Sequence, residues 1–179
     1  MSEKPAGILG FFAEKSLIRN EQRLKRKKTT QNIANTKSAM ILMEYDTAYQ
    51  TRLQALLEFF NKNKISFTIV VYLPKKEQVT TFMPRPELFP FSKKDCNWLG
   101  IPSGHELDGV LQQKPDILIE FDLSPVFQLA WISRLSNSSF KIGRGENKAH
   151  LDLIIQDPGK QDQVFIQQII HWLQAIKTT

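Results

Sequence analysis

The sequence is poor in the residues that most metal and nucleophilic sites use. Its 179 residues include one cysteine, Cys96, and three histidines, at positions 105, 150 and 171. A single cysteine excludes an internal disulfide and suits a reducing compartment. These four residues lack the spacing of metal ligands, so we expect no metal site. Lys93 and Lys94 lie close to Cys96 and could lower the pKa of its thiol, but no pattern brings a histidine to it, which favours a packing role.

Long apolar runs and phosphate-binding glycines are also lacking. The longest apolar stretches, such as Ile65–Leu73, have the length of a strand and fall far short of the ~20 residues that cross a bilayer. The N-terminal residues lack the charge order and cleavage site of a signal peptide, so we expect a cytoplasmic protein. No glycine stands at Glu44–Thr47, the first strand–helix turn. Gly143 and Gly145 form an isolated G-x-G after a strand, which a tight turn explains equally well. We therefore expect no nucleotide or other cofactor.

Apolar residues make up 41% of the chain, which is typical of a globular protein. Strand-like runs alternate with helical patterns from residue 38 onward. Strands are predicted at Ser38–Tyr45, Ile65–Leu73, Asp116–Phe121, Phe140–Ile142 and Leu151–Gln156, and helices at Ala48–Lys64, His105–Lys114, Pro125–Leu135 and Gln161–Ile176. This alternation predicts an α/β fold, a Rossmann-like three-layer sandwich with a mostly parallel sheet of about five or six strands.

Two regions give less definite patterns. In Lys75–Pro102, a short strand is predicted at Val79–Met83, and prolines at 84, 86 and 90 are expected to interrupt any long element. The aromatic residues of this region predict a loop that packs against the body. In the last helix, the expected buried side consists of Val164, Ile169 or Ile170, Leu173 and Ile176.

The positive charge of the chain is concentrated at its N-terminus. Residues 1–37 hold nine Lys or Arg and three Glu, whereas residues 38–179 hold equal numbers of basic and acidic side chains. We therefore divide the chain into a basic helical arm with its linker, residues 1–37, and an α/β domain, residues 38–179. Such an asymmetry indicates a polyanionic partner for the arm.

A helix is predicted over Phe11–Lys28, because this stretch has no Pro or Gly and is rich in helix-forming residues. A polar, turn-prone linker follows it. Arginine and lysine on one helix face can contact successive phosphates without reading sequence. The predicted RNA-binding residues are Lys15, Arg19, Arg23, Lys25, Arg26, Lys27 and Lys28. A solvated basic face is one alternative, and an anionic membrane that accepts Ile8, Leu9, Phe11 and Phe12 is another.

A ligand crevice is expected where the strands of an open α/β sheet end. The residues predicted there are Asp46, Asp122, Ser124 and Arg144. Their types suit a small polar ligand, but Asp122 or Ser124 could equally cap the following helix, and we favour capping. No catalytic residue is assigned.

The segment FSKKDCNWLGIP at 91–102, with the blocks at Asp116–Asp122 and Phe140–Arg144, resembles an uncharacterised family, a domain of unknown function common in Bacteroidetes. The resemblance covers most of the chain, including the basic N-terminal helix. It implies no known activity and supplies no catalytic residues.

More distantly, residues 115–145 are similar to the N-terminal domain of heptosyltransferase-type glycosyltransferases. The matching pieces are the strand Asp116–Phe121, the helix end Trp131–Ser136 and the strand end Lys141–Gly143. Those enzymes have two domains and hold the nucleotide-sugar mainly in the second, which has no counterpart here. The resemblance implies a Rossmann-like half-domain and argues against an independent transferase.

The sequence thus favours a non-enzymatic adaptor that binds RNA, plausibly the ribosome, through its basic helix. Binding is expected to weaken with salt, and deletion of residues 1–30 is expected to abolish it without unfolding the body. Two alternatives are a protein of glycosyltransferase descent that binds a nucleotide-sugar or another small ligand, and a peripheral membrane or protein-complex subunit.

Overall fold

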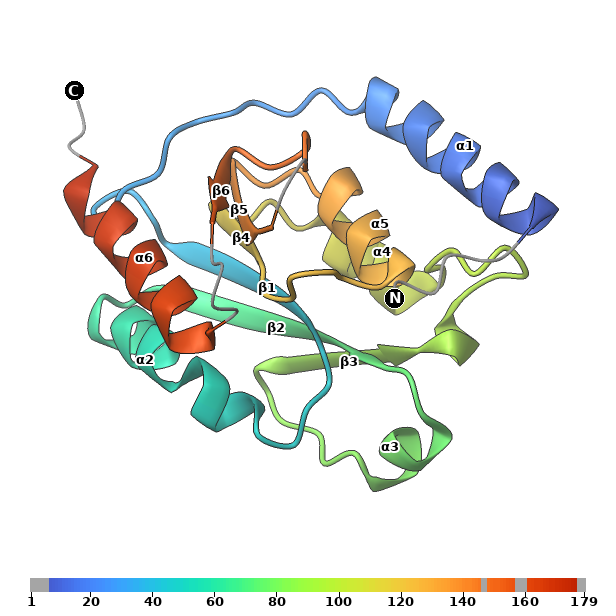
Figure 1. The fold of residues 1–179 in the computed structure, drawn as a ribbon, viewed down its shortest axis with the longest axis horizontal. Helices are drawn as coiled ribbons and strands as arrows, with labels where there is room; N and C mark the ends of the chain where they lie inside the picture. The colour runs from blue at the N-terminus through green and yellow to red at the C-terminus, as the bar shows by residue number, and fades with distance from the viewer. Residues whose placement is uncertain (1–6, 146–147, 157–160, 177–179) are drawn as a thin grey trace.

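Six parallel strands form one open sheet in the computed structural model, which describes residues 7–145, 148–156 and 161–176 (Figure 1). The strands are β1 (Ser38–Glu44), β2 (Ser66–Leu73), β3 (Leu88–Ser92), β4 (Ile117–Glu120), β5 (Phe140–Arg144) and β6 (Leu153–Ile155). The helices are α1 (Ile8–Arg23), α2 (Tyr49–Lys62), α3 (Lys76–Thr81), α4 (His105–Gln112), α5 (Phe127–Leu135) and α6 (Asp162–Ala175), with a 3₁₀ turn at Lys93–Asp95. None of these helices is long and apolar enough to span a membrane.

The strand order is β3-β2-β1-β4-β5-β6, and every neighbouring pair is parallel. The chain therefore builds one half of the sheet outward from β1 and the other half outward from β4. The point where the order reverses lies between these two central strands, whose carboxyl ends lie next to each other. The prediction of an α/β, Rossmann-like fold with a basic N-terminal helix is confirmed.

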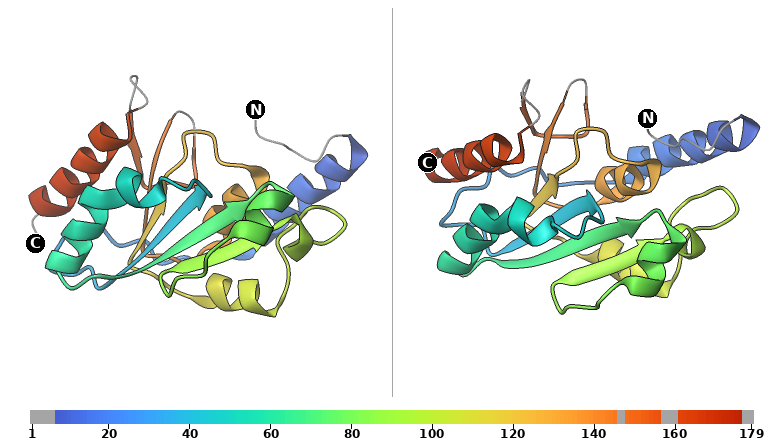
Figure 2. Two further views of the ribbon diagram at one scale, coloured as in Figure 1. Left: turned by 90° about the horizontal axis from the view of Figure 1, so that it is seen from below. Right: turned by 60° about the horizontal axis from the view of Figure 1, so that its bottom comes forward.

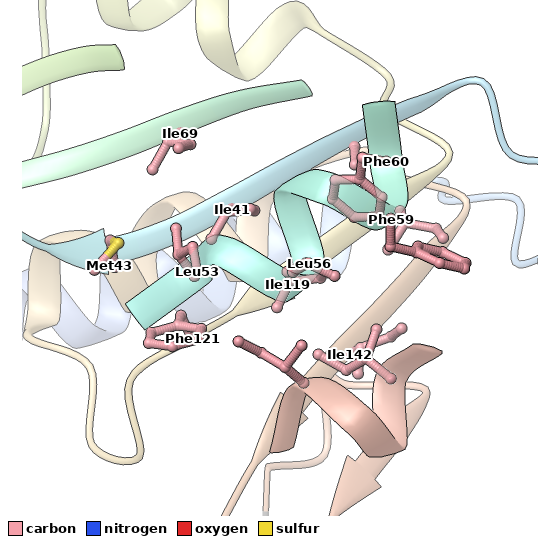
Figure 3. Close-up of a cluster of buried hydrophobic side chains, with 14 of the residues drawn as sticks. Ile41, Met43, Leu53, Leu56, Phe59, Phe60, Ile69, Ile119, Phe121 and Ile142 are labelled. Carbon is pink, nitrogen blue, oxygen red and sulfur yellow. The ribbon is translucent and has the colours of Figure 1, made fainter. Parts of the chain in front are cut away.

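Helices α2 and α6 cover one face of the sheet and pack against each other (Figure 2). Leu53, Leu56 and Phe60 of α2 recur at helical spacing, so they point from one side of the helix toward the strands. Figure 3 shows Leu53 and Leu56 close to Ile41 of β1 and Ile119 of β4. Each such side chain contributes ~1.5–3 kcal/mol by leaving water, which makes this face the principal core.

Helices α4 and α5 cover the opposite face. Leu107 and Val110 of α4 and Leu129 and Ile132 of α5 are buried against strand residues such as Leu118. Both faces of the central strands are therefore covered. This explains the continuous apolar run of β1, whose five inner residues are all buried.

Helix α1 lies along α5, outside the three layers (Figure 1). Its buried residues Ala13 and Leu17 pack against Phe127 and Trp131 of α5 and against Ile101. The segment that follows α1 passes the end of α6 before it enters β1 (Figure 1).

Backbone amides of this linker donate hydrogen bonds to the body at intervals along its length. The Thr29 amide donates to the Ser139 carbonyl at 3.1 Å and the Ile33 amide to the Leu173 carbonyl at 2.9 Å. The Lys37 amide donates to Asp116 Oδ2 at 2.8 Å. The predicted arm and linker are thus bound to the domain along residues 13–37, and residues 1–6 lie outside the described part.

The region after β2 differs from its prediction in two places. Val79–Met83 is not a strand, because α3 occupies Lys76–Thr81 and the Gln78 side chain accepts a hydrogen bond from the Lys75 amide at 3.1 Å. The prolines do not prevent a strand at Leu88–Ser92. Pro90 is tolerated because β3 lies at the edge of the sheet and pairs only with β2.

Helix positions differ in three smaller ways. Helix α1 ends at Arg23, five residues before the predicted end, where Leu24 turns to an extended conformation. Helix α5 begins at Phe127, so Pro125 precedes the helix instead of standing in its first turn. The buried side of α6 consists of Phe165, Ile166, Ile169 and Leu173, while Val164 is exposed. The prediction is therefore confirmed for Ile169 and Leu173 and wrong for Val164.

Candidate functional site

Charged side chains cluster at the carboxyl ends of the central strands, where the ligand crevice was predicted. Arg52 of α2 joins Asp46, at 3.2 Å, to Asp162 of α6, at 2.7 Å. Arg144, at the end of β5, contacts the other oxygen of Asp162 at 2.6 Å. Asp46 and Arg144 were predicted from the sequence. Arg52 and Asp162 were not, because they lie in the first turns of two helices that only the fold brings together.

Asp122 connects the two loops that meet where the strand order reverses. Its carboxylate accepts a hydrogen bond from the Glu44 amide at 2.6 Å, across the gap between β4 and β1. The favoured capping role is therefore wrong for Asp122, and α5 has no side-chain cap, so it is wrong for Ser124 as well. Ser124 is exposed. Burial raises the pKa of Asp122, against the lowering effects of the Glu44 amide and Arg52.

Two further backbone amides of the first strand–helix turn also bind acceptors within the protein. The Tyr45 amide donates to the Tyr72 carbonyl at 2.8 Å, and the Ala48 amide donates to Asp46 Oδ1 at 2.8 Å. With the Glu44 amide bound to Asp122, three backbone amides at this turn bind the protein's own acceptors and are not available to a phosphate.

The two arginines of the crevice stack on aromatic rings. The guanidinium carbons of Arg52 and Arg144 lie 5.1 and 5.2 Å from the centroid of Phe121, and that of Arg144 lies 5.1 Å from the centroid of Phe165. Only 5% of the Arg144 side chain is exposed. These contacts hold α2, α6 and the sheet together, so the observed geometry gives the cluster a structural role.

A second charged cluster lies at the end of β4, on the α5 side of the sheet. Glu120, only 1% exposed, contacts Lys148 at 2.9 Å and the His150 ring. Burial alone would raise the pKa of Glu120, but the hydrogen bond from His150 and the charge of Lys148 lower it to about 2. Sequence spacing did not reveal this cluster, because Lys148 and His150 lie beyond the next strand in the chain.

Lys141 of β5 is buried nearby and donates to the Ser133 carbonyl at 2.6 Å and the Arg134 carbonyl at 3.2 Å. Burial, with the charge of Arg26, lowers its pKa to about 8. Both of its acceptors lie in the last turn of α5. We assign it a structural role.

The Cys96 thiol is not activated. Burial and the Asp95 carboxylate raise its pKa to about 11, against a weaker lowering effect of Lys93. This agrees with the packing role that the sequence favours. In the part of the chain that the structure describes, no three His, Cys, Asp or Glu residues are grouped in a way that could hold a metal ion.

The predicted RNA-binding residues fall into two groups. Lys15, Arg19 and Arg23 are exposed on α1, and Lys25 and Lys27 are exposed on the segment after it. The remaining two, Arg26 and Lys28, both contact Asp152, Lys28 at 3.2 Å.

Among the seven predicted RNA-binding residues, Arg26 is buried in an internal ion pair, and only 6% of its side chain is exposed. Lys28 stays 65% exposed in spite of its ion pair. The Asp152 carboxylate also accepts from the Lys141 amide at 2.9 Å, so Arg26 anchors the linker to the start of β5. We call the five other exposed cations, Lys15, Arg19, Arg23, Lys25 and Lys27, the basic surface.

The orientation of the basic surface is fixed by the opposite side of α1. Ala13 and Leu17 are buried on α5, and Glu21 forms an ion pair with Arg134 of that helix. On the 100° helical wheel, Lys15 and Arg19 lie about opposite to Leu17. The first turns of α1 also expose large apolar side chains: Ile8 is 76% exposed, Phe11 65% and Phe12 51%.

Comparison with known proteins gives a family but no activity. The chain matches no curated protein. Residues 10–176 match a family of unknown function, DUF6913. The match begins inside α1 and ends after α6, so the N-terminal helix and the sheet belong to one family unit. The chain is therefore a member of the family of unknown function DUF6913.

Proposed function

We propose that this protein binds RNA through the basic surface and acts as an adaptor without catalytic activity. The observation that carries the proposal is the placement of five exposed cations on a helix and linker whose other sides are fixed to the body. Lys15 and Arg23 are eight residues apart, about 12 Å along a helix axis. Cations at such intervals can contact several phosphates of one strand.

The exposed rings of Phe11 and Phe12 favour an RNA with unpaired bases. Their centroids lie 5.9 Å apart with the rings at 73°, and both rings are more than half exposed. Aromatic side chains beside cations stack on unpaired bases, at about 1–3 kcal/mol per base. The expected ligand of the basic surface is therefore an RNA loop or single-stranded segment. Large ribonucleoprotein particles such as the ribosome expose segments of this kind.

The arrangement is less suitable for an anionic membrane. Ile8 and Phe12 lie on the same outward side of α1 as Lys15 and Arg19, by the helical wheel. An interfacial helix needs its apolar and basic residues on different sides. Insertion of α1 along its length would therefore carry these cations into the hydrocarbon layer.

The nucleotide-sugar alternative has no comparable support. It depended on Asp122, Ser124 and Arg144, of which Asp122 binds the Glu44 amide and Arg144 binds Asp162. Ser124 is exposed apart from them. Helix α1, by contrast, supplies cations and aromatic rings together at the surface.

Sedimentation of the tagged full-length protein through sucrose gradients tests the proposal in native lysate. The deletion of residues 1–30 is no longer a clean test, because it would also remove Leu17 and Arg26, which are buried against the body. We use instead the variant K15Q/R19Q/R23Q. Its matched control is K62Q/K64Q/K114Q, which loses the same charge at other exposed positions.

The wild type and the control are expected to co-migrate with large particles and to be released by ribonuclease or by high salt. The α1 variant is expected to remain at the top of the gradient. Free migration of the wild type at low salt, or unchanged co-migration of the α1 variant, would contradict the proposal.

A further inference from the structure

A second basic site lies at the carboxyl ends of β2 and β3, away from the crevice between β1 and β4. A cavity of about 500 Å³ opens there. Its lining consists of Leu73, Pro74, Lys75, Lys76, Val79, Thr80, Ser92, Lys93 and Lys94. The four lysines come from two separate segments, one after each strand, and all four are exposed. We call this cavity the lysine pocket.

We propose that the lysine pocket binds a small organic phosphate. The lysine ammonium groups contact the phosphate group, and the apolar part of the ligand packs on Leu73, Pro74 and Val79. The volume is within the range of about 300–1,000 Å³ that is usual for small-molecule sites. Its position is the edge at which open parallel sheets bind ligands. The site is independent of the RNA surface proposed for α1.

The wall made by α3 is held in place by contacts to the rest of the sheet. Gln78 accepts a hydrogen bond from the Lys75 amide at 3.1 Å and donates to the Tyr45 carbonyl at 3.4 Å. Phe82, just after α3, packs edge-on against Tyr45, with the two ring centroids 5.3 Å apart. The backbone that carries Lys75 and Lys76 is thus fixed without help from their side chains.

The opposite wall is a capped turn. Asp95 accepts hydrogen bonds from the Ser92 amide at 2.8 Å and from its hydroxyl at 3.0 Å. The Ser92 oxygen in turn accepts from the Lys94 amide at 3.3 Å. This closed set of bonds sets the start of the turn that presents Lys93 and Lys94.

The four lysines outnumber the two acidic residues that adjoin them in the chain, Glu77 and Asp95. Among the ion pairs between described residues, none involves these four lysines. Asp95, the nearest acidic residue in the chain to Lys93 and Lys94, is bound to Ser92. Lysine binds phosphate as a point charge, and a multiply charged anion would relieve the mutual repulsion of the four ammonium groups.

The proposal is tested by isothermal titration calorimetry of the full chain with 1-naphthyl phosphate, inorganic phosphate and 1-naphthol. The aromatic phosphate is expected to bind at least about tenfold more tightly than inorganic phosphate, because the apolar lining adds burial to the charge attraction. The naphthol is expected not to bind measurably, since it lacks the charge.

Two variants separate the pocket from general charge attraction. K75Q/K93Q removes one cation from each wall, and K62Q/K114Q removes the same charge from exposed positions outside the pocket lining. The first is expected to weaken naphthyl phosphate binding at least about tenfold and the second less than about twofold. Circular dichroism checks that both variants are folded.

Three results would overturn the proposal: no heat with any phosphate at millimolar concentration, equal weakening by the two variants, or loss of RNA binding in K75Q/K93Q without any naphthyl phosphate binding. The last would make the pocket part of an RNA surface. The α1 variant K15Q/R19Q/R23Q is expected to bind naphthyl phosphate normally, so failure of the RNA proposal leaves this one testable.

Discussion

Gly143 is a residue at which the fold leaves little room for a side chain. It pairs with Glu120 across β4 and β5, and a Cβ atom built on it would lie 2.6 Å from Leu151 Cδ1 and 3.1 Å from Glu120 Cβ. We expect Gly143→Ala to lower the free energy of unfolding by about 1–3 kcal/mol, as is usual for overpacked sites. Urea unfolding followed by tryptophan fluorescence measures this.

Gly109 provides the matched control, because a Cβ atom there has no neighbour within 4 Å. It lies inside α4, where alanine is favoured over glycine. Gly109→Ala is expected to raise the free energy of unfolding by about 0.5–1 kcal/mol. A larger loss at Gly109 than at Gly143 would show that the packing around β5 is not as described.

Glu120 makes the free energy of unfolding depend on pH in the acid range. Its pKa is about 2 in the folded protein, below the ordinary value of 4.5, so the folded state binds fewer protons than the unfolded state between these values. The stabilisation is complete above pH 4.5 and is lost as the pH falls toward 2. At about 1.4 kcal/mol per pKa unit, the loss is of the order of 3 kcal/mol.

The variant Glu120→Gln tests this dependence, with the exposed residue Glu58 changed to Gln as control. We expect Glu120→Gln to lower the free energy of unfolding at pH 7 by about 2–4 kcal/mol, since Lys148 and His150 lose their common acceptor. Between pH 4.5 and 2.5 its stability should fall less than that of the wild type. Parallel pH curves for wild type and variant would contradict the assignment.

At this scale the sequence predicted residue types better than residue partners. The exposure of Lys15, Arg19 and Arg23 could be predicted, because it follows from helical spacing over a local segment. The burial of Arg26 could not, since its partner Asp152 stands 126 positions later. The contacts of Arg52 with Asp162 and of Glu120 with His150 also depend on the arrangement of strands.

Helix α1 is the element on which the proposed function depends, and its attachment to α5 can be tested directly. Leu17 is 2% exposed and Ile18, its neighbour, 43%. We expect Leu17→Ala to cost about 2–4 kcal/mol in the docking of α1 and Ile18→Ala less than about 0.5 kcal/mol.

Hydrogen exchange measures this attachment locally. In Leu17→Ala the amides of α1 should exchange faster while those of β1 remain protected. In Ile18→Ala both should exchange as in the wild type. Equal exchange in the two variants would mean that α1 is not held by its apolar side, and that the orientation of the basic surface is not fixed.

Elements with strong periodicity were predictable and those set by tertiary context were not. The helix Tyr49–Lys62 and the strand Ser66–Leu73 follow from local patterns of apolar residues. The strand Leu88–Ser92 contains Pro90 and exists because β2 offers it an edge. The early end of α1 at Arg23 depends on the attachment of the linker to the body.

As a whole, the molecule combines a sheet whose charged side chains at the central strand ends bind internal partners with a cationic helix on the outside. Arg52, Arg144 and Asp122 bind internal partners at the site where α/β proteins commonly hold a ligand. The charge available to a partner lies elsewhere, on α1 and in the lysine pocket. The α/β class could be predicted from the alternation of patterns, but the strand order, and hence which side chains meet, could not.

The salt dependence of RNA binding by the purified protein tests the central claim most directly. The measurement is fluorescence anisotropy with a labelled single-stranded RNA, for the wild type, K15Q/R19Q/R23Q and the control K62Q/K64Q/K114Q. If the three α1 cations each contact a phosphate, their loss should reduce the slope of log K against log salt by about 2, at about 0.7 per contact. The control should keep the wild-type slope. Equal slopes for the wild type and the α1 variant, at equal affinity, would contradict the claim that α1 binds RNA.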